Sequence, residues 1–151
     1  MSDLSLNHFS IRSLQIEKTR DFFTQVIGLK EGPRPDFPFP GHWLYCGDTS
    51  NYAHAVLHLI AMDPTDPVGL KNYLGDRDAS ALHGSGAVDH VAFFATDLAA
   101  MLKKLKQSGV DYKQRTVPSI GLHQLFLIDP NGIVIELNYP ASEQAAQEQA
   151  G

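Results

Sequence analysis

The chain reads as two successive stretches that share one order of hydrophobic and polar patterns. In the first stretch, residues 4–12 alternate loosely between apolar and polar side chains, which indicates a strand. Apolar positions then recur near helical spacing over residues 17–27, and Gly28 supplies a C-terminal stop for a helix there. Three more strands are predicted, a weak one from Leu29 and two at 42–46 and 54–61.

The second stretch repeats this order. Residues 87–95 predict a strand, and Asp97 is a plausible N-cap for a helix over 98–108 that Gly109 would end. Three further strands are predicted at 111–117, 122–128 and 132–138. A repeat of this length indicates one supersecondary unit used twice. The predicted fold is therefore α+β, with two βαβββ modules forming a curved mixed sheet around a central site.

The same patterns predict the domain organisation. The first module covers residues 1–61 and the second covers 87–140. Residues 62–86 form a surface linker or a lid, since so long a loop is uncommon inside a compact domain, and a short helix is predicted around 68–74. The tail, 141–151, is polar and low in complexity, so we expect it to fray or to form a loose helix.

Composition restricts the class of protein. The 151 residues are 43% hydrophobic and 19% charged, which is ordinary for a globular protein. A net charge of -5 without a Lys/Arg cluster argues against nucleic acid as a partner. The N-terminus has no signal-peptide pattern, and no apolar run approaches the ~18 residues of a membrane span. A cytoplasmic location is expected, with the single Cys46 as a small buried hydrophobe.

Overlaying the two stretches aligns four polar residues in pairs. His8 falls on His90 and His58 falls on Glu136, and the alternation of each strand places all four opposite the apolar positions. If the halves join edge to edge, these side chains converge. Imidazoles and a carboxylate bind Zn²⁺, Fe²⁺, Ni²⁺, Co²⁺ or Mn²⁺, and a cation would offset the cost of burying Glu136. Core histidines and a solvent-facing glutamate are the alternative that the pattern alone leaves open.

The most specific segment is GLHQLFLIDPNGIVIELNYP, residues 121–140, in which D-P-x-G-x-x-x-E runs from Asp129 to Glu136. With NHFSIRS and GAVDHVAF at the starts of the two modules, the chain resembles the vicinal oxygen chelate superfamily over about residues 4–140. This is the superfamily of glyoxalases, bleomycin-resistance proteins and extradiol dioxygenases. The resemblance implies paired βαβββ modules around a divalent metal ion, and a homodimer.

The resemblance also implies a ligand set. His8, His90 and Glu136 match the metal ligands of the family by position. The place of His58 is held by a ligand, usually Glu or Gln, in the glyoxalase I and epimerase branches. A histidine there keeps a donor nitrogen and removes a negative charge, so it departs from the family pattern.

Three functions are compatible with the resemblance. Lyase or isomerase chemistry, with four ligands and Glu136 as the base, is preferred. A ring-cleaving dioxygenase would need His58 off an Fe²⁺ ion, and Phe126 stands where the dioxygenase motif carries a tyrosine, which counts against it. A non-catalytic binding protein of the bleomycin-resistance type is the third function, although such proteins generally lack the metal ligands.

Other side chains are predicted to line the pocket for a small oxygenated molecule. The candidates for substrate binding are Arg12, Arg115, Gln124, Phe126 and Asn138. Trp43 and Tyr45 are expected to serve packing, and His123 is expected to be a partly exposed strand residue. The identities of the substrate and of the metal stay open.

Overall fold

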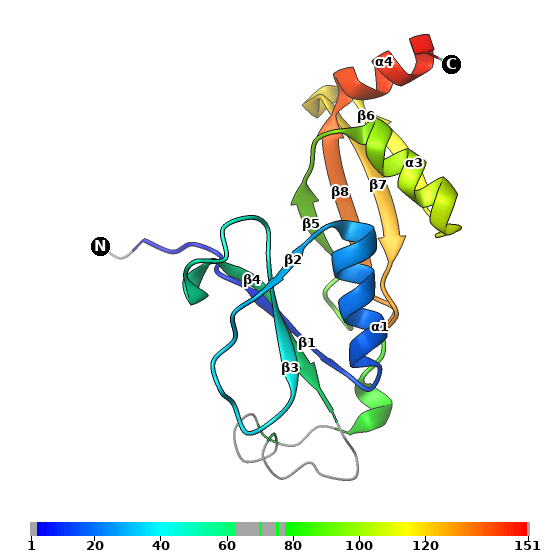
Figure 1. Ribbon diagram of the computed structural model, residues 1–151. Helices are drawn as coiled ribbons and strands as arrows, with labels where there is room; N and C mark the ends of the chain where they lie inside the picture. The colour runs from blue at the N-terminus through cyan, green and yellow to red at the C-terminus, as the bar shows by residue number, and fades with distance from the viewer. Residues whose placement is uncertain (1–2, 63–69, 71–74, 76–77, 151) are drawn as a thin grey trace. The chain divides into compact units, whose positions relative to one another are not determined.

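The computed structural model describes residues 3–62, 70, 75 and 78–150 (Figure 1). The chain divides into two units, Met1–His83 and Gly84–Gly151, which are described separately below. No helix of these described segments is long and apolar enough to cross a membrane.

The sheet of the first unit has four strands in the order β1-β4-β3-β2. Strand β1 (Phe9–Ser13) runs parallel to β4 (Ala55–Ala61), and β3 (Gly41–Tyr45) is antiparallel to both β4 and β2 (Lys30–Gly32). Between β1 and β2, helix α1 (Ile16–Asp21) continues into wider π-type turns over Phe22–Ile27. Gly28 then ends the helix with a left-handed φ of 101°, as predicted.

The start of the chain differs from its prediction. Strand β1 begins only at Phe9, and Leu4 and Leu6 are 96% and 92% exposed. Their alternation with polar residues is that of a strand, but the register of β4 gives them no partner because the β1–β4 pairing begins at Phe9. The exposed Cys46 also contradicts the prediction that this thiol is buried.

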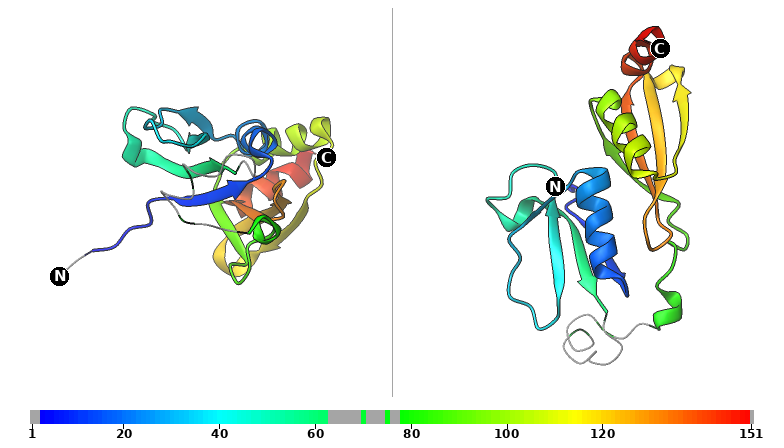
Figure 2. Two further views of the ribbon diagram at one scale, coloured as in Figure 1. Left: turned by 90° about the horizontal axis from the view of Figure 1, so that it is seen from below. Right: turned by 45° about the vertical axis from the view of Figure 1, so that its right-hand side comes forward.

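One face of the first sheet packs against the helix (Figure 2). Leu57 and Leu59 of β4 are fully buried there together with Phe23. Ser13 of β1 and Thr19 of α1 share a buried hydrogen bond of 3.1 Å between their hydroxyl groups, which fixes the helix to the end of the strand. Because side chains alternate along a strand, the residues between these leucines face the other side of the sheet.

The second unit repeats this topology, with strands in the order β5-β8-β7-β6. Strand β5 (His90–Phe94) is parallel to β8 (Val134–Pro140), and β7 (Leu122–Ile128) is antiparallel to β8 and to β6 (Lys113–Val117). Helix α3 (Leu98–Ser108) has the predicted bounds, and the Asp97 carboxylate accepts from the Ala100 amide at its N-terminus. The predicted α+β fold of two βαβββ units is confirmed.

The tail forms helix α4 (Ala141–Ala150) against α3 and β7. Oε1 of Glu143 accepts hydrogen bonds from the backbone amides of Asp97 at 2.8 Å and Leu98 at 3.3 Å, so α4 caps the start of α3. The tail is therefore anchored through a side chain that its polar composition did not single out. The helix predicted around 68–74 lies outside the described residues, apart from Leu70.

Replacing Glu143 by alanine is expected to lower the free energy of unfolding by about 1–2 kcal/mol, because two amides at a helix N-terminus lose a carboxylate acceptor. Urea unfolding of the full chain, followed by circular dichroism, measures this change. Glu148→Ala removes an exposed carboxylate from the same helix and should cost much less. Equal destabilisation by the two variants would contradict the capping role.

Candidate functional site

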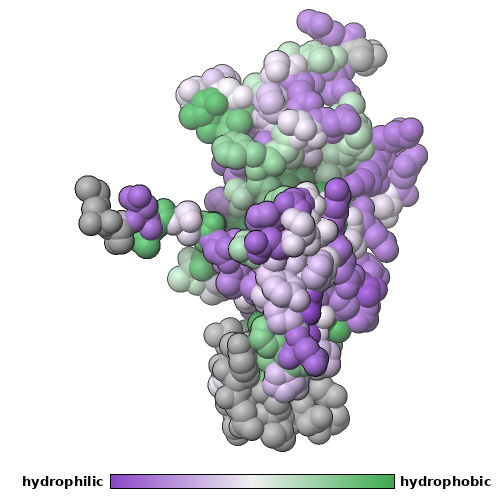
Figure 3. Space-filling model, turned by 60° about the vertical axis from the view of Figure 1, so that its left-hand side comes forward, coloured by the Kyte–Doolittle hydropathy of each residue, from purple (hydrophilic) through white to green (hydrophobic). Residues whose placement is uncertain are grey.

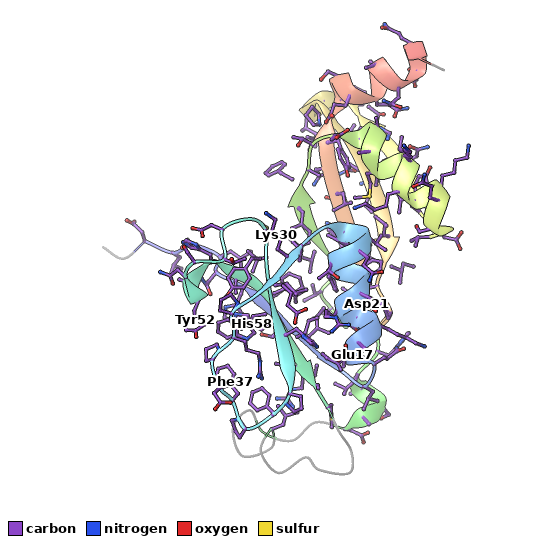
Figure 4. All side chains as sticks on the ribbon, in the orientation of Figure 1. Glu17, Asp21, Lys30, Phe37, Tyr52 and His58 are labelled. Atoms are coloured by element: carbon purple, nitrogen blue, oxygen red, sulfur yellow. The ribbon has the colours of Figure 1, made fainter. Side chains whose placement is uncertain are left out.

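Each unit places one pair of repeat-related side chains on the sheet face opposite its helix. In the first unit, His58 of β4 lies beside Ser10 of β1, two residues after His8. In the second unit, Glu136 of β8 lies beside Ala92, two residues after His90. The two strand pairs thus have the same register, which places His58 and Glu136 at corresponding positions. Figure 4 shows His58 on the side of the first sheet away from α1.

In the first unit His58 lies between two other rings. The centroids of the His8 and His58 rings are 3.7 Å apart with planes tilted by 20°, and those of Trp43 and His58 are 3.7 Å apart with planes tilted by 5°. Trp43 is directly opposite His58 in the β3–β4 register and also meets the edge of Tyr52. Trp43 was expected to serve packing, and in the structure it packs by stacking on His58. Tyr45 does pack, being fully buried.

The environment of His58 keeps its ring neutral. Burial lowers the pKa of His58 to about 4, and the charges of His8 and Arg34 act in the same direction. Its Nε2 atom is buried and has no hydrogen-bond partner among the residues that the structure describes. A neutral imidazole with an unused ring nitrogen is the form that binds a metal ion, so this residue fits a role as a metal ligand.

The stacked geometry limits how the two first-unit histidines can act together. The lone pair of an imidazole nitrogen lies in the plane of its ring. When two stacked rings have centroids 3.7 Å apart and planes tilted by only 20°, their in-plane lone pairs do not meet at one ion at the ~2 Å that a metal–nitrogen bond requires. In this arrangement only one of the two rings can bind a given ion, and both can bind it only after one ring turns. His8 is exposed and precedes β1, and its Nδ1 lies 2.6 Å from Asn7 Oδ1, so a turn of this ring would exchange one local hydrogen bond.

In the second unit His90 and Glu136 contact each other. His90 Nε2 lies 3.6 Å from Glu136 Oε1, and His90 Nδ1 lies 2.8 Å from a carboxylate oxygen of Asp89. The hydrogen bond to Asp89 raises the pKa of His90, with a smaller contribution from Glu136 and an opposing effect of burial. Glu136 is only 6% exposed, and its Oε2 accepts a hydrogen bond from Asn138.

Four of the five predicted substrate-binding residues contact one another in the second unit. Arg115 donates to Gln124 at 2.7 Å, Gln124 donates to Asn138 at 2.9 Å, and the Arg115 guanidinium lies 5.2 Å from the centre of the Phe126 ring. The fifth, Arg12, belongs to the first unit and donates to the Gly75 carbonyl at 3.1 Å.

An open hollow of about 740 Å³ lies on the face of the second sheet that carries Glu136. It is lined by residues 110–113 and by Phe126, Ile128 and Val134. Figure 3 shows hydrophobic residues gathered on the second unit, where Val88, Phe94 and Ile128 are among the exposed apolar side chains. The polar residues around Glu136 therefore have an apolar surface beside them.

Within the described segments, no group of three or more His, Cys, Asp or Glu side chains is arranged to hold a metal ion. The donors occur instead as two pairs, one in each unit, His8 with His58 and His90 with Glu136. His8 and His58 meet as stacked rings, and His90 and Glu136 meet across the paired strands β5 and β8.

The prediction for His123 is wrong, because this side chain is only 2% exposed. It lies on the helix face of β7, with Nδ1 at 2.8 Å from the Thr116 hydroxyl and Nε2 at 3.1 Å from the side-chain oxygen Oε1 of Gln114. Its role is therefore to connect β7 to β6, away from the face that carries Glu136.

Replacing His123 by glutamine should reveal a pH-dependent part of the stability. Burial lowers the pKa of His123 below its ordinary 6.5. The contribution of the neutral ring to the free energy of unfolding is therefore complete above pH 6.5 and is lost as the pH falls below that value. We expect His123→Gln to cost about 1–2 kcal/mol at pH 7.5, from altered hydrogen bonds, and less at pH 5. Urea unfolding at both values measures the difference, and a gap that widens at pH 5 would contradict this sign.

The contact between Trp43 and His58 was not predicted from the sequence. Aligning β3 with β7 in the repeat would have found it, because Trp43 opposes His58 as Phe126 opposes Glu136. The signal is thus present in the repeat, although not in the local sequence around Trp43.

Comparisons with known proteins agree with this architecture. Residues 5–137 match the family described as Glyoxalase/Bleomycin resistance protein/Dioxygenase superfamily. "Glyoxylase I 4" of Arabidopsis thaliana is 27% identical over 88% of this chain and 69% of its own length. A "Lactoylglutathione lyase" of Pseudomonas putida is 25% identical over 89% of this chain and 84% of its own length.

A solved structure shows a similar fold. A putative glyoxalase family protein from Bacillus anthracis aligns with a TM-score of 0.61 and 18% identity, over 93% of this chain and 98% of that one. At this identity the likeness establishes the fold alone.

Proposed function

We propose that this chain, which belongs to the Glyoxalase/Bleomycin resistance protein/Dioxygenase superfamily, is a divalent-metal-dependent enzyme of the lyase or isomerase type. Its substrate would be a small molecule that presents two neighbouring oxygens. The names of the two curated relatives, a glyoxylase I and a lactoylglutathione lyase, support the enzyme class.

The observation that carries the proposal is the pairing of donors at repeat-related positions. His8 meets His58 with ring centroids 3.7 Å apart, and His90 meets Glu136 at 3.6 Å. The strand register places His58 and Glu136 at corresponding positions, on the face of each sheet opposite its helix. Two separate structural roles would not require this symmetry.

The residues proposed to hold the ion are His8 and His58 from the first unit and His90 and Glu136 from the second. Such an ion acts as a Lewis acid toward substrate oxygens and as a template for their orientation. Glu136 is the proposed base, since it is buried and carries a second oxygen, Oε1, that faces His90. The neutral state of His58 suits it to bind without competition from a proton.

A ring-cleaving dioxygenase is the second candidate, and one observation favours it. Because His8 and His58 are stacked, only one of them binds the ion unless a ring turns. Two histidines and one carboxylate would then remain, which is the ligand set of non-haem Fe²⁺ oxygenases with open positions. Phe126, in place of the tyrosine of the dioxygenase motif, argues against this candidate.

Two assays on metal-loaded protein separate the candidates. The purified chain is incubated with Zn²⁺, Ni²⁺, Mn²⁺ or Fe²⁺, its metal content is measured, and each form is tested for lactoylglutathione formation and for oxygen uptake with catechols. Lyase activity that Glu136→Gln abolishes supports the proposal. Catechol-dependent oxygen uptake with Fe²⁺ alone would replace it with the second candidate, and failure to retain any of the four metals would overturn both.

A further inference from the structure

Four side chains on the face of the second sheet opposite helix α3 form one continuous chain of hydrogen bonds. Arg115 Nε donates to Gln124 Oε1 at 2.7 Å, and Gln124 Nε2 donates to Asn138 Oδ1 at 2.9 Å. Asn138 Nδ2 then donates to Glu136 Oε2 at 2.8 Å. We call these residues, Arg115, Gln124, Asn138 and Glu136, the amide chain. It crosses three strands because Arg115 opposes Gln124 and Gln124 opposes Asn138 in the sheet register.

The two ends of the amide chain fix its direction. A guanidinium can only donate hydrogen bonds and a carboxylate can only accept them. Gln124 must therefore turn its oxygen toward Arg115, and Asn138 must turn its NH₂ group toward Glu136. Turning over either amide would place two acceptors or two donors face to face. Arg115 and Glu136 thus require the same orientation of the two amides between them, so each end supports the hydrogen bonds of the other.

Three of the four side chains of the amide chain are buried. Gln124 is 6% exposed, Asn138 is 8% and Glu136 is 6%, so water has little access to replace a lost partner. The exposed Arg115 is held at the outer end by Gln124 and by the Phe126 ring, 5.2 Å below the guanidinium.

The described strands of the first unit hold no equivalent of the amide chain. The residues that correspond to Gln124 and Asn138 in the repeat are Gly41 and Ile60, which oppose each other in the same register and have no side-chain donor. His58, which corresponds to Glu136, has an unpartnered Nε2. The amide chain is therefore not a requirement of the βαβββ fold, and it accompanies the carboxylate.

We propose that Arg115 is a positioning residue, which acts through Gln124 and Asn138 to hold Glu136 by Oε2. The carboxylate then presents Oε1, the oxygen on the His90 side, to the metal ion or to the substrate proton. This role rests on the function proposed above for Glu136. The proposal assigns Arg115, Gln124 and Asn138 to positioning the Glu136 carboxylate, whereas the sequence pattern predicted that they bind the substrate.

The test compares Arg115→Met with Lys113→Met in the full chain. Both residues are exposed and lie on the same face of β6, and both variants remove one positive charge. In the metal-free protein, Arg115→Met should shift the side-chain NH₂ resonances of Asn138 in ¹⁵N NMR spectra, whereas Lys113→Met should not. With Co²⁺, Arg115→Met should weaken binding about tenfold in isothermal titration calorimetry, since losing a residue that orients a ligand typically costs 10–100-fold.

A second variant tests transmission along the chain. Gln124→Met keeps the size of the side chain and both ends of the amide chain but removes its middle, and it should shift the same Asn138 resonances and weaken Co²⁺ binding to a similar extent.

Two results would overturn the proposal. Asn138 resonances that stay at wild-type values in Arg115→Met would do so. An equal loss of Co²⁺ affinity in Lys113→Met would also do so, because a general charge effect would then explain the loss in Arg115→Met. A wild-type protein that binds no Co²⁺ would refute the proposed function of Glu136, and unshifted Asn138 resonances in Arg115→Met would separately refute the amide chain.

Discussion

Replacing Glu136 by glutamine is expected to weaken divalent-metal binding by about 100-fold or more, beyond the 10–100-fold typical of losing a residue that only orients a ligand. The change removes the single carboxylate of the proposed set and keeps the shape of the side chain. Its amide oxygen can still accept from Asn138, so the local hydrogen bond survives the substitution. Isothermal titration calorimetry with Co²⁺ measures the loss.

The matched control for this prediction is Glu148→Gln. It makes the same chemical change at an exposed position of helix α4 in the same unit. Its Co²⁺ affinity should stay within about twofold of the wild-type value, because an exposed charge is screened by salt. A Glu136→Gln protein that binds Co²⁺ as tightly as this control would remove Glu136 from the site.

The second large effect is expected at His58. His58→Phe keeps a flat ring beside Trp43 and removes both ring nitrogens, so we expect a loss of Co²⁺ affinity of about 10–100-fold, comparable to other disruptions of metal coordination. Trp43 is the only tryptophan of the chain and stacks on His58 at 3.7 Å. Its fluorescence should therefore fall when Co²⁺ binds to the wild-type protein and should respond much less in the variant.

His54→Phe serves as the control for His58, since His54 is an exposed histidine of the same unit paired with Asp48. Unchanged Co²⁺ affinity in His58→Phe would show that His58 is not a ligand. The remaining set of two histidines and Glu136 would then favour the dioxygenase candidate.

Local sequence signals predicted the elements that local physics determines. Gly28 and Gly109 end their helices with left-handed backbone, and Asp97 caps α3, because each acts within a few residues of its own position. The alternation before Phe9 misled for the opposite reason. A strand exists only where a neighbour pairs with it, and the residues around Leu4 and Leu6 have the pattern of a strand outside the β1–β4 register.

The repeat predicted four candidate ligands, but not the contacts around them. Overlaying the two halves paired His8 with His90 and His58 with Glu136, whereas the structure brings His8 to His58 and His90 to Glu136 within each unit. Trp43 reaches His58, and Arg115 reaches Glu136 through two amides, by pairing between strands. Those contacts depend on how β3 aligns with β4 and how β6, β7 and β8 align, which no short sequence segment specifies.

The number of Co²⁺ ions bound by each chain tests the central claim most directly, which is that the two donor pairs serve one ion. Calorimetric titration of the metal-free protein should show one ion per chain, and His8→Ala, in the first unit, and Glu136→Gln, in the second, should each weaken that same binding event. No binding at all, or two ions per chain with each variant abolishing only one of them, would contradict the account.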